Sequence, residues 1–336
     1  MDFELVTNFP DGLEAEWNAL LERSANHVPF LRHEYLNAWW QTRGGGEWPA
    51  AALAVVTARQ GGKLVGLAPL FLTEWQGRRA LLLLGSIEIS DYLDLLAAPD
   101  DLDEFCQGLL EFLMKSELDW QVLDLYNLLD TSPTLSALEN AAAVKGWKFR
   151  IEQLQHSPYI PLPGDWETYL ANIDKKQRHE IRRKMRRAEE NEVPVYWYTA
   201  SDPDMLVGEI EDFIRLMAND PQKALFLTEP MREQMRNMIR CAFEKGCLHL
   251  AFLEVGGEKA AAYLSFDYLD RLWIYNSGID LRFRELSPGW VLLGELLRWA
   301  NEAGRTEFDF MRGDEEYKYR FGAVDRFVVR AIVERT

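Results

Sequence analysis

The sequence has few cysteines and histidines, and this scarcity excludes several kinds of chemistry. Its three cysteines are Cys106, Cys241 and Cys247, an odd number without the spacing of a metal site. We expect them to be reduced and buried, and we assign no nucleophile among them. The five histidines form no HExxH or comparable array, so we expect neither a zinc enzyme nor a bound metal.

Long apolar runs and basic residues are also in short supply. No stretch is apolar enough to span a bilayer, and residues 1–10 lack a basic, apolar secretion signal. We therefore expect a cytoplasmic protein that does not insert into a membrane. Its 37 Lys and Arg against 54 Asp and Glu give a net charge of -17. Such a charge argues against broad nucleic-acid binding, which depends on neutralising many phosphates.

One segment departs from this acidic average. Residues 175–187 read KKQRHEIRRKMRR, with eight Lys or Arg and one acid. Ile181 and Met185 are four residues apart, which predicts a helix with one narrow buried edge and a basic surface. That surface is either a solvated face balanced by the glutamates at 189, 190 and 192, or a docking place for an anionic acceptor or donor tail. We favour docking and name Arg178 and Arg182 as acceptor-binding residues.

Two similar halves follow one another along the chain. Residues 53–72 predict a strand, a Gly-Gly turn and a second strand, residues 79–84 predict a third, and residues 250–279 repeat the plan. This repeat indicates a duplicated domain in a chain of 336 residues, which is long enough for two cores. Three prolines and a glycine between His156 and Gly164 mark the seam. We predict a mixed α/β fold with domains at 1–158 and 159–336.

The second half contains a candidate anion cradle. Arg284 precedes Ser287, Pro288 and Gly289, and an amphipathic helix follows. Anions bind at helix starts, where N–H groups are unpaired and the helix dipole is positive. Gly289 lets a phosphate approach the backbone, Pro288 suits a first turn, and Ser287 is a favoured N-cap. Ser-Pro-Gly alone indicates only a helix cap. Its place between strands predicted at 271–279 and 306–311 favours an enzyme with a phosphate-bearing donor.

These residues resemble a known family. Arg284-x-x-Ser287-x-Gly289 is similar to the pyrophosphate motif of the GNAT acetyltransferases, with serine in place of the first glycine. The blocks SPGWVLLGELLRWANEAG, EFDFMRGDEEYKYRFG and SPYIPLPGDW resemble the tandem-domain branch with cellulose-biosynthesis-type acetyltransferases and Fem-type peptidyltransferases. The resemblance covers essentially the whole chain. It implies two tandem GNAT-like domains, each a mostly antiparallel sheet flanked by helices. It also implies acetyl-CoA or another acyl-CoA as co-substrate, bound by Arg284, Ser287, Pro288, Gly289 and Trp290.

Reactive side chains follow the next predicted strand. By likeness to the aromatic-Lys-x-x-Phe-Gly signature of the Fem-type enzymes, Lys318 stabilises negative charge on the donor or in the transition state. Tyr317 and Tyr319 are both candidates for the acid that protonates a departing thiolate, and the sequence does not choose between them. Asp309, between two phenylalanines of a strand, is either a general base or the structural partner of an arginine, and we favour the structural role.

The first half has the scaffold without the cradle. No arginine-to-glycine motif follows its third strand, so we expect no donor site there. Asp91 and Tyr92 belong to a polar cluster. They either present hydrogen bonds to an acceptor in a cleft between the domains or form a turn with one wet face.

Three functions are compatible with these patterns. The leading hypothesis is acyl transfer from acyl-CoA to an amine or hydroxyl of a sugar, peptide or polysaccharide precursor. The basic run and the Lys318 signature support an alternative, a Fem-type peptidyltransferase that uses aminoacyl-tRNA. The third is a non-catalytic protein that holds a CoA-linked or nucleotide-linked ligand.

Overall fold

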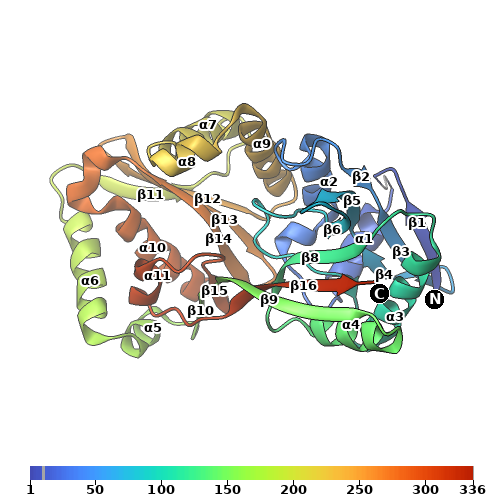
Figure 1. Ribbon diagram of the computed structural model, residues 1–336. Coiled ribbons are helices and arrows are strands. Elements are labelled where there is room, and N and C mark those ends of the chain that lie inside the picture. The colour runs from blue at the N-terminus through green and yellow to red at the C-terminus, as the bar shows by residue number, and fades with distance from the viewer. Residues whose placement is uncertain (10–11, 336) are drawn as a thin grey trace. The chain divides into compact units, whose positions relative to one another are not determined.

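The computed structural model describes residues 1–9 and 12–335, which form two compact units (Figure 1). The first unit comprises residues 1–156 together with the C-terminal residues from 326 onward, and the second comprises residues 157–325. The predicted second domain, 159–336, therefore contains a strand that belongs elsewhere. Strand β16 (Phe327–Glu334) pairs with β8 (Val122–Leu129) and β9 (Lys148–His156) of the first unit. Pairing between segments so distant in sequence leaves no local pattern.

Two sheets and four α-helices make up the described part of the first unit. The helices are α1 (Glu14–Leu21), α2 (His33–Thr42), α3 (Leu102–Lys115) and α4 (Pro133–Val144), with 3-10 turns η1 (Pro29–Leu31) and η2 (Pro99–Asp101). One sheet has the order β1-β3-β4-β7, from β1 (Asp2–Val6), β3 (Val55–Gln60), β4 (Lys63–Ala68) and β7 (Leu96–Ala97). The other has the order β2-β5-β6-β8-β16-β9 and includes β2 (Ala52–Leu53), β5 (Leu70–Trp75) and β6 (Arg78–Leu83).

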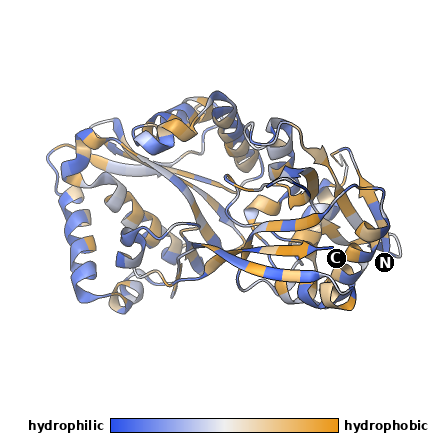
Figure 2. Ribbon diagram, viewed as in Figure 1, coloured by the Kyte–Doolittle hydropathy of each residue, from blue (hydrophilic) through white to orange (hydrophobic). Residues whose placement is uncertain are grey.

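Pro69 separates these two sheets. The second strand of the predicted hairpin divides there, because β4 pairs with β3 whereas β5 pairs with β6. A proline has no N–H to donate to a ladder, so it suits the point where the chain leaves one sheet for the other. In the second sheet β8 is buried along its whole length, and β16 beside it is rich in hydrophobic residues (Figure 2). Arg330 of β16 donates two hydrogen bonds of 2.6 Å to the buried carboxylate of Asp124.

A single six-stranded sheet with the order β10-β15-β14-β13-β12-β11 forms the centre of the second unit. Its strands are β10 (Tyr159–Pro161), β11 (Val195–Thr199), β12 (Leu248–Val255), β13 (Glu258–Tyr268), β14 (Arg271–Ile279) and β15 (Glu307–Asp309). Its helices are α5 (Trp166–Asn172), α6 (Lys175–Glu189), α7 (Leu206–Met217), α8 (Pro221–Phe226), α9 (Glu229–Glu244), α10 (Pro288–Glu302) and α11 (Glu316–Arg320), with a 3-10 helix η3 (Leu281–Leu286).

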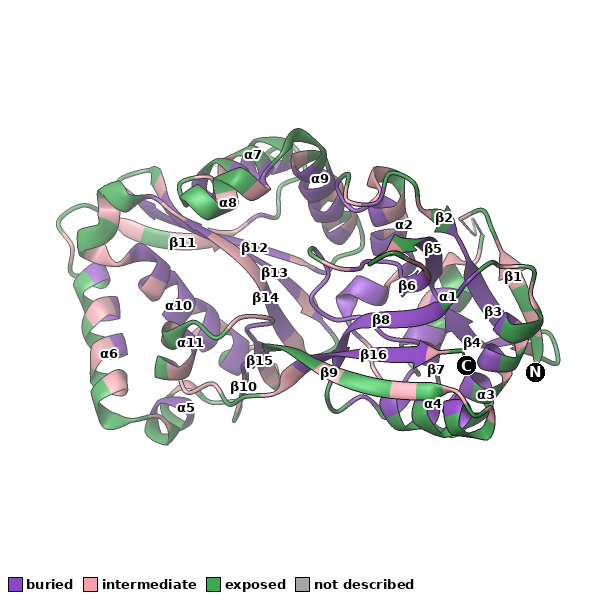
Figure 3. Ribbon diagram, in the orientation of Figure 1, coloured by how far each residue is buried: buried purple, intermediate pink, exposed green. Residues whose placement is uncertain are grey.

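Helices lie on both sides of this sheet (Figure 1). Helices α5, α6 and α10 share one hydrophobic core with the strands, and α7 packs on β13 and β14. Ile181 and Met185 are the buried edge of α6, as predicted, and most of the helix is exposed (Figure 3). A side chain at Gly294 of α10 would lie 2.9 Å from Met185 Sδ, so this glycine allows the two helices to approach closely.

Strands β14 and β15 are parallel neighbours for only part of their length. Their pairing begins at Arg271 and Glu307 and ends at Trp273 and Asp309, whereas β14 continues to Ile279. The connection between them contains α10. In the first unit the connection between the parallel strands β6 and β8 contains α3. The predicted mixed α/β fold is therefore confirmed, with two mostly antiparallel arrangements that each include one parallel crossover.

Candidate active site

The start of α10 has an unusual backbone. Ser287 stands at the N-cap position, but with φ 52° and ψ 53° it is left-handed, and its side chain makes no capping hydrogen bond. Its carbonyl accepts the N–H groups of Trp290 at 3.0 Å and Val291 at 3.1 Å. Pro288 has no N–H, so Gly289 supplies the one amide of this turn without a backbone acceptor among the described residues. The GNAT pattern has glycine at the position of Ser287, and glycine adopts this left-handed backbone easily.

Gly289 packs closely on the end of β14, a contact that the sequence did not predict. A Cβ there would lie 2.5 Å from Ile279 Cδ1, so the first turn of α10 rests directly on the end of β14. Arg284, by contrast, is 79% exposed, and its nearest carboxylate is that of Glu285 at 3.8 Å. The guanidinium can therefore turn towards a phosphate without breaking a strong ion pair.

The indole of Trp290 is wedged between two elements. Lys184 of α6 lies 4.1 Å above its ring, and the Phe321 ring lies 4.6 Å away. Its buried Nε1–H finds no partner among the described residues. The Trp290 ring thus joins the basic helix to the start of α10.

The end of β14 is an open strand edge. The N–H of Asp280 donates to Ala260 O at 2.8 Å, so in this antiparallel pairing the backbone groups of Ser277 and Ile279 point away from β13. Strand β15 does not extend far enough to meet them. Side chains occupy three of the four groups: Lys223 Nζ donates to Ser277 O at 2.7 Å, Asn219 Nδ2 donates to Ile279 O at 3.0 Å, and Asn276 Oδ1 accepts the Ser277 N–H at 2.9 Å. The Ile279 N–H has no acceptor among the described residues.

Lys318 is built into the fold next to this edge. Its buried ammonium donates to Arg312 O at 2.8 Å and Gly313 O at 3.0 Å, and pairs with the Glu315 carboxylate at 2.9 Å. These three contacts use all three N–H donors of the ammonium. The structure therefore gives Lys318 a role in holding the 312–315 loop.

Tyr317 and Tyr319 lie in different surroundings. Tyr317 packs edge-on against Phe310, and its hydroxyl makes no hydrogen bond to the described residues. Burial, with contributions from Tyr263 and Glu315, raises the pKa of Tyr317 well above its usual value. The Tyr319 hydroxyl donates to Asp325 Oδ1 at 2.7 Å. Of the two tyrosines, Tyr317 is thus the one whose hydroxyl has no hydrogen-bond partner among the described residues.

Asp309 is fully buried and shapes the end of β15. Its carboxylate accepts the N–H of Met311 at 2.7 Å, and Met311 has the left-handed φ of 55°. The structure thus gives Asp309 a role in the turn that follows β15, and its predicted pairing with an arginine stays a prediction. The turn directs the chain away from β14 and so helps to open the edge described above.

The predicted acceptor residues are spread over both units. Asp91 and Tyr92, in the first unit, are 8% and 1% exposed, and the Arg326 guanidinium lies 5.5 Å from the Tyr92 ring. Arg178 donates to Leu170 O at 3.2 Å near the end of α5, and Arg182 pairs with Glu167. Arg178 and Arg182 thus have partners within the second unit, and the acceptor role of all four residues stays a prediction.

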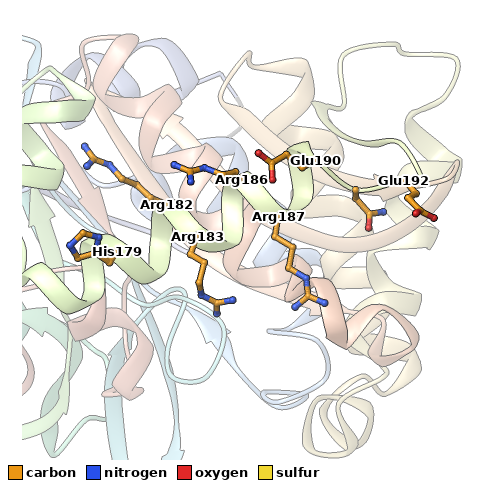
Figure 4. Close-up of a pocket in the computed structure, with 8 residues that line it drawn as sticks. His179, Arg182, Arg183, Arg186, Arg187, Glu190 and Glu192 are labelled. Carbon is orange, nitrogen blue, oxygen red and sulfur yellow. The ribbon is translucent and has the colours of Figure 1, made fainter.

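Of the other basic residues of α6, Arg183 and Lys184 pair with Glu180. A hollow of about 800 Å³ lies among His179, Arg182, Arg183, Arg186, Arg187, Glu190, Asn191 and Glu192. Figure 4 shows Arg183 and Arg187 projecting to one side of the helix, and Arg182 and Arg186 to the other. Arg186 and Arg187 form no ion pair within the described chain. The helix thus has the basic surface that we predicted, and the docking of an anionic ligand on it stays a prediction.

Asn219, Lys223, Tyr263 and Glu315 belong to this site and were not predicted. Tyr263 is buried opposite Ser277 in the sheet, and the Glu315 carboxylate acts on the pKa values of Tyr263, Tyr317 and Lys223. Only strand register and the packing of α7 bring these residues together. No spacing in the sequence signals that arrangement.

Two absences apply to the part of the chain that the structure describes. No helix in residues 1–9 and 12–335 combines the length and apolar character needed to cross a membrane. No group of three or more His, Cys, Asp or Glu side chains there is arranged to hold a metal ion.

Comparison with known proteins places this site in a family. Residues 175–319 match the family model described as an acetyltransferase (GNAT) domain, whereas a search of curated proteins gave no match. The chain is similar to the crystal structure of FemX, with a TM-score of 0.66 at 12% identity, over 98% of this chain and 97% of that one. It is also similar to the C-terminal domain of a putative lysylphosphatidylglycerol synthetase from Agrobacterium fabrum, with a TM-score of 0.56 at 12% identity, over 94% and 91%. A third similar structure is L-PGS from Bacillus licheniformis, with a TM-score of 0.54 at 14% identity, over 90% and 91%. The region 175–319 thus matches the model of a GNAT acetyltransferase domain, and the chain as a whole has the fold of FemX.

Proposed function

We propose that the second unit transfers an acyl group from an acyl-CoA to an amine or hydroxyl of a sugar, peptide or polysaccharide-precursor acceptor. The observation that carries this proposal is the open edge of β14 directly beside the first turn of α10. A CoA thioester has a pyrophosphate followed by an extended arm with two secondary amides. The neighbouring features of the site match these two chemical groups in the same order.

The donor's phosphates would bind at the start of α10. The Gly289 N–H lacks a backbone acceptor, and Arg284 is exposed with only a weak ion pair. A helix start favours anions by its dipole as well as by its N–H groups. The amide arm would then lie along β14, where the Ser277 carbonyl and the Ile279 N–H point outward and can pair with an extended ligand.

Acyl transfer here requires attack on the thioester carbonyl. A neutral amine or hydroxyl forms the new bond to the carbonyl carbon, the carbon–sulfur bond breaks, and the nucleophile's proton leaves to solvent or a base. Tyr317 is the residue we assign to the departing sulfur. Its pKa is raised by burial, so the phenol keeps its proton and serves as a hydrogen-bond donor to the thiolate rather than as a strong acid. Lys318 supports the loop that carries Tyr317.

Isothermal titration with CoA and acetyl-CoA tests the donor assignment. We expect both to bind, and Arg284→Glu to weaken each by at least about tenfold, because a charge that favours phosphate becomes one that repels it. Arg79→Glu is the matched control, since Arg79 is an exposed arginine of the first unit whose nearest carboxylate is 4.0 Å away. Binding should be unchanged in that control. No binding of any common acyl-CoA would reject the proposal, and binding without turnover over a broad acceptor panel would favour a non-catalytic ligand-holding protein.

A second candidate is a Fem-type transferase that uses aminoacyl-tRNA. The basic surface of α6, with Arg186 and Arg187 unpaired among the described residues, favours it. We expect a tRNA complex to weaken steeply between low and moderate salt, and Arg186→Glu with Arg187→Glu to abolish it. If tRNA does not shift at low salt, this candidate is rejected.

A further inference from the structure

Side chains of Asn219, which follows α7, and of Lys223, in α8, cover the open edge of β14. Lys223 Nζ donates to Ser277 O at 2.7 Å and Asn219 Nδ2 donates to Ile279 O at 3.0 Å. Both residues follow α7, whose last turn lies so close to β14 that a Cβ at Gly278 would be 2.5 Å from the Leu216 carbonyl carbon. Asp220 then caps α8 by accepting the Lys223 N–H at 3.1 Å. The backbone that carries Lys223 is therefore held firmly against the strand.

Lys223 occupies the position that an added strand would use. A residue placed opposite Gly278 in a parallel ladder donates its N–H to Ser277 O and accepts the N–H of Ile279. The ammonium of Lys223 makes the first of these two bonds, and the second group is vacant. A ligand amide that pairs along this edge therefore competes with Lys223 for the Ser277 carbonyl.

We propose that Lys223 is a competing internal ligand that covers the donor edge of β14 and must leave Ser277 O when an amide-bearing donor binds. This inference rests on the proposed function. It makes Lys223 a residue that determines donor affinity and selects for donors with a secondary amide at this position. A ligand without that amide leaves Lys223 in place.

Glu315 is the carboxylate that we assign to the displaced ammonium, because its charge acts on the pKa of Lys223. Burial lowers the pKa of Lys223, while the Asp220 and Glu315 carboxylates raise it. A half-buried ammonium without a partner is costly, so Lys223 can leave Ser277 O only where a carboxylate receives its ammonium. Glu315 is 57% exposed and pairs with Lys318 at 2.9 Å, which leaves its carboxylate with room for a second cation. Asp220 is engaged by the first amides of α8.

Binding of two ligands to Lys223→Met tests the inference. CoA carries the amide arm, whereas adenosine 3′,5′-bisphosphate shares its phosphates but lacks the arm. We expect Lys223→Met to bind CoA about tenfold more tightly. In this variant CoA does not have to break the charge-assisted hydrogen bond from Lys223 to Ser277 O, and a bond of that kind contributes about this factor. Its affinity for the bisphosphate should equal that of the wild type. Lys223→Arg should restore the wild-type affinity for CoA, and Glu315→Gln should weaken CoA but not the bisphosphate.

Controls separate this inference from the proposed function. Lys115→Met, at an exposed lysine of the first unit, should leave both affinities unchanged, and thermal unfolding shows whether each variant is folded. In turnover, Lys223→Met should lower KM for the donor and leave kcat unchanged. If Lys223→Met binds CoA equally or more weakly, or if its kcat falls, Lys223 does not compete with the donor for Ser277 O. The proposed function is unaffected by that result. A wild-type protein that binds neither ligand refutes both.

Discussion

Replacing Ser287 with glycine tests whether this residue stabilises the fold or binds a ligand. Ser287 is left-handed, with φ 52° and ψ 53°, directly before α10, and its hydroxyl caps no amide of the helix. Glycine adopts this backbone conformation without steric cost. We therefore predict that Ser287→Gly stabilises the second unit, although it removes one hydroxyl from the candidate phosphate site.

The expected size follows from two opposing terms. A left-handed backbone costs a residue with a Cβ roughly 1–2 kcal/mol. The greater freedom of glycine in the unfolded chain costs about 0.5–1 kcal/mol. Since no capping hydrogen bond is lost, the free energy of unfolding of the second unit should rise by ~0.5–1 kcal/mol.

Hydrogen exchange of the α10 amides in increasing urea measures this effect locally, because a chain with two compact units need not unfold in one step. Ser136→Gly is the opposite control. Ser136 is an exposed residue inside α4, where glycine should lower stability by about 0.5–1 kcal/mol. If Ser287→Gly also lowers the stability, the backbone argument is refuted.

The same variant reports on the ligand. A hydroxyl that donates to a donor phosphate should cost Ser287→Gly about tenfold in CoA affinity, even though the protein becomes more stable. Unchanged affinity would show that this motif position acts through its backbone alone.

Three further predictions concern other groups. Lys318→Met should lower the free energy of unfolding of the second unit by about 2–4 kcal/mol in urea titrations, because it leaves two loop carbonyls and the Glu315 carboxylate without their donor. Unchanged stability would show that Lys318 does not hold the 312–315 loop. Tyr317→Phe should leave stability within about 0.5 kcal/mol, since its hydroxyl bonds to no described residue, but lower kcat about 10–100-fold at constant KM; a change in KM alone would remove Tyr317 from the reaction. Burial raises the pKa of Glu47 to about 7, above its value of 4.5 in the unfolded chain, so the folded state holds an extra proton between these two values. The free energy of unfolding should therefore fall as pH rises from about 4.5 to about 7. Urea midpoints at pH 5 and pH 8 should differ less in Glu47→Gln than in the wild type.

Features with a local physical cause could be predicted from the sequence. The spacing of Ile181 and Met185 predicted the buried edge of α6, and the Gly256-Gly257 turn, with φ of 61° and 82°, predicted the β12–β13 hairpin. The place of Asp309 between two aromatic residues predicted an arginine partner, whereas the contact at its carboxylate is the Met311 amide, a backbone group that the sequence pattern does not specify.

Features that depend on register or loop shape could not be predicted in the same way. The Lys318 motif was recognisable, but its burial follows from the path of residues 312–315, which no spacing encodes. Lys223 reaches Ser277 only because β15 stops at Asp309 while β14 continues. An open edge is a property of two strands and the difference in their lengths. The residues that cover such an edge therefore have no signature of their own.

The two crossovers of the repeat differ in what their helices offer to an anion. Helix α3 has Asp103 and Glu104 in its first turn, whereas α10 has no acid there. Each carboxylate at a helix start interacts with the dipole by about 0.3–1 kcal/mol and repels a bound phosphate, so the start of α3 is already supplied with its own anions. The start of α10 instead keeps the Gly289 N–H without a backbone acceptor and Arg284 exposed. Under the proposed function, the charges of a single helical turn are enough to distinguish a helix start that favours a phosphate from one that does not, without any change in the strands.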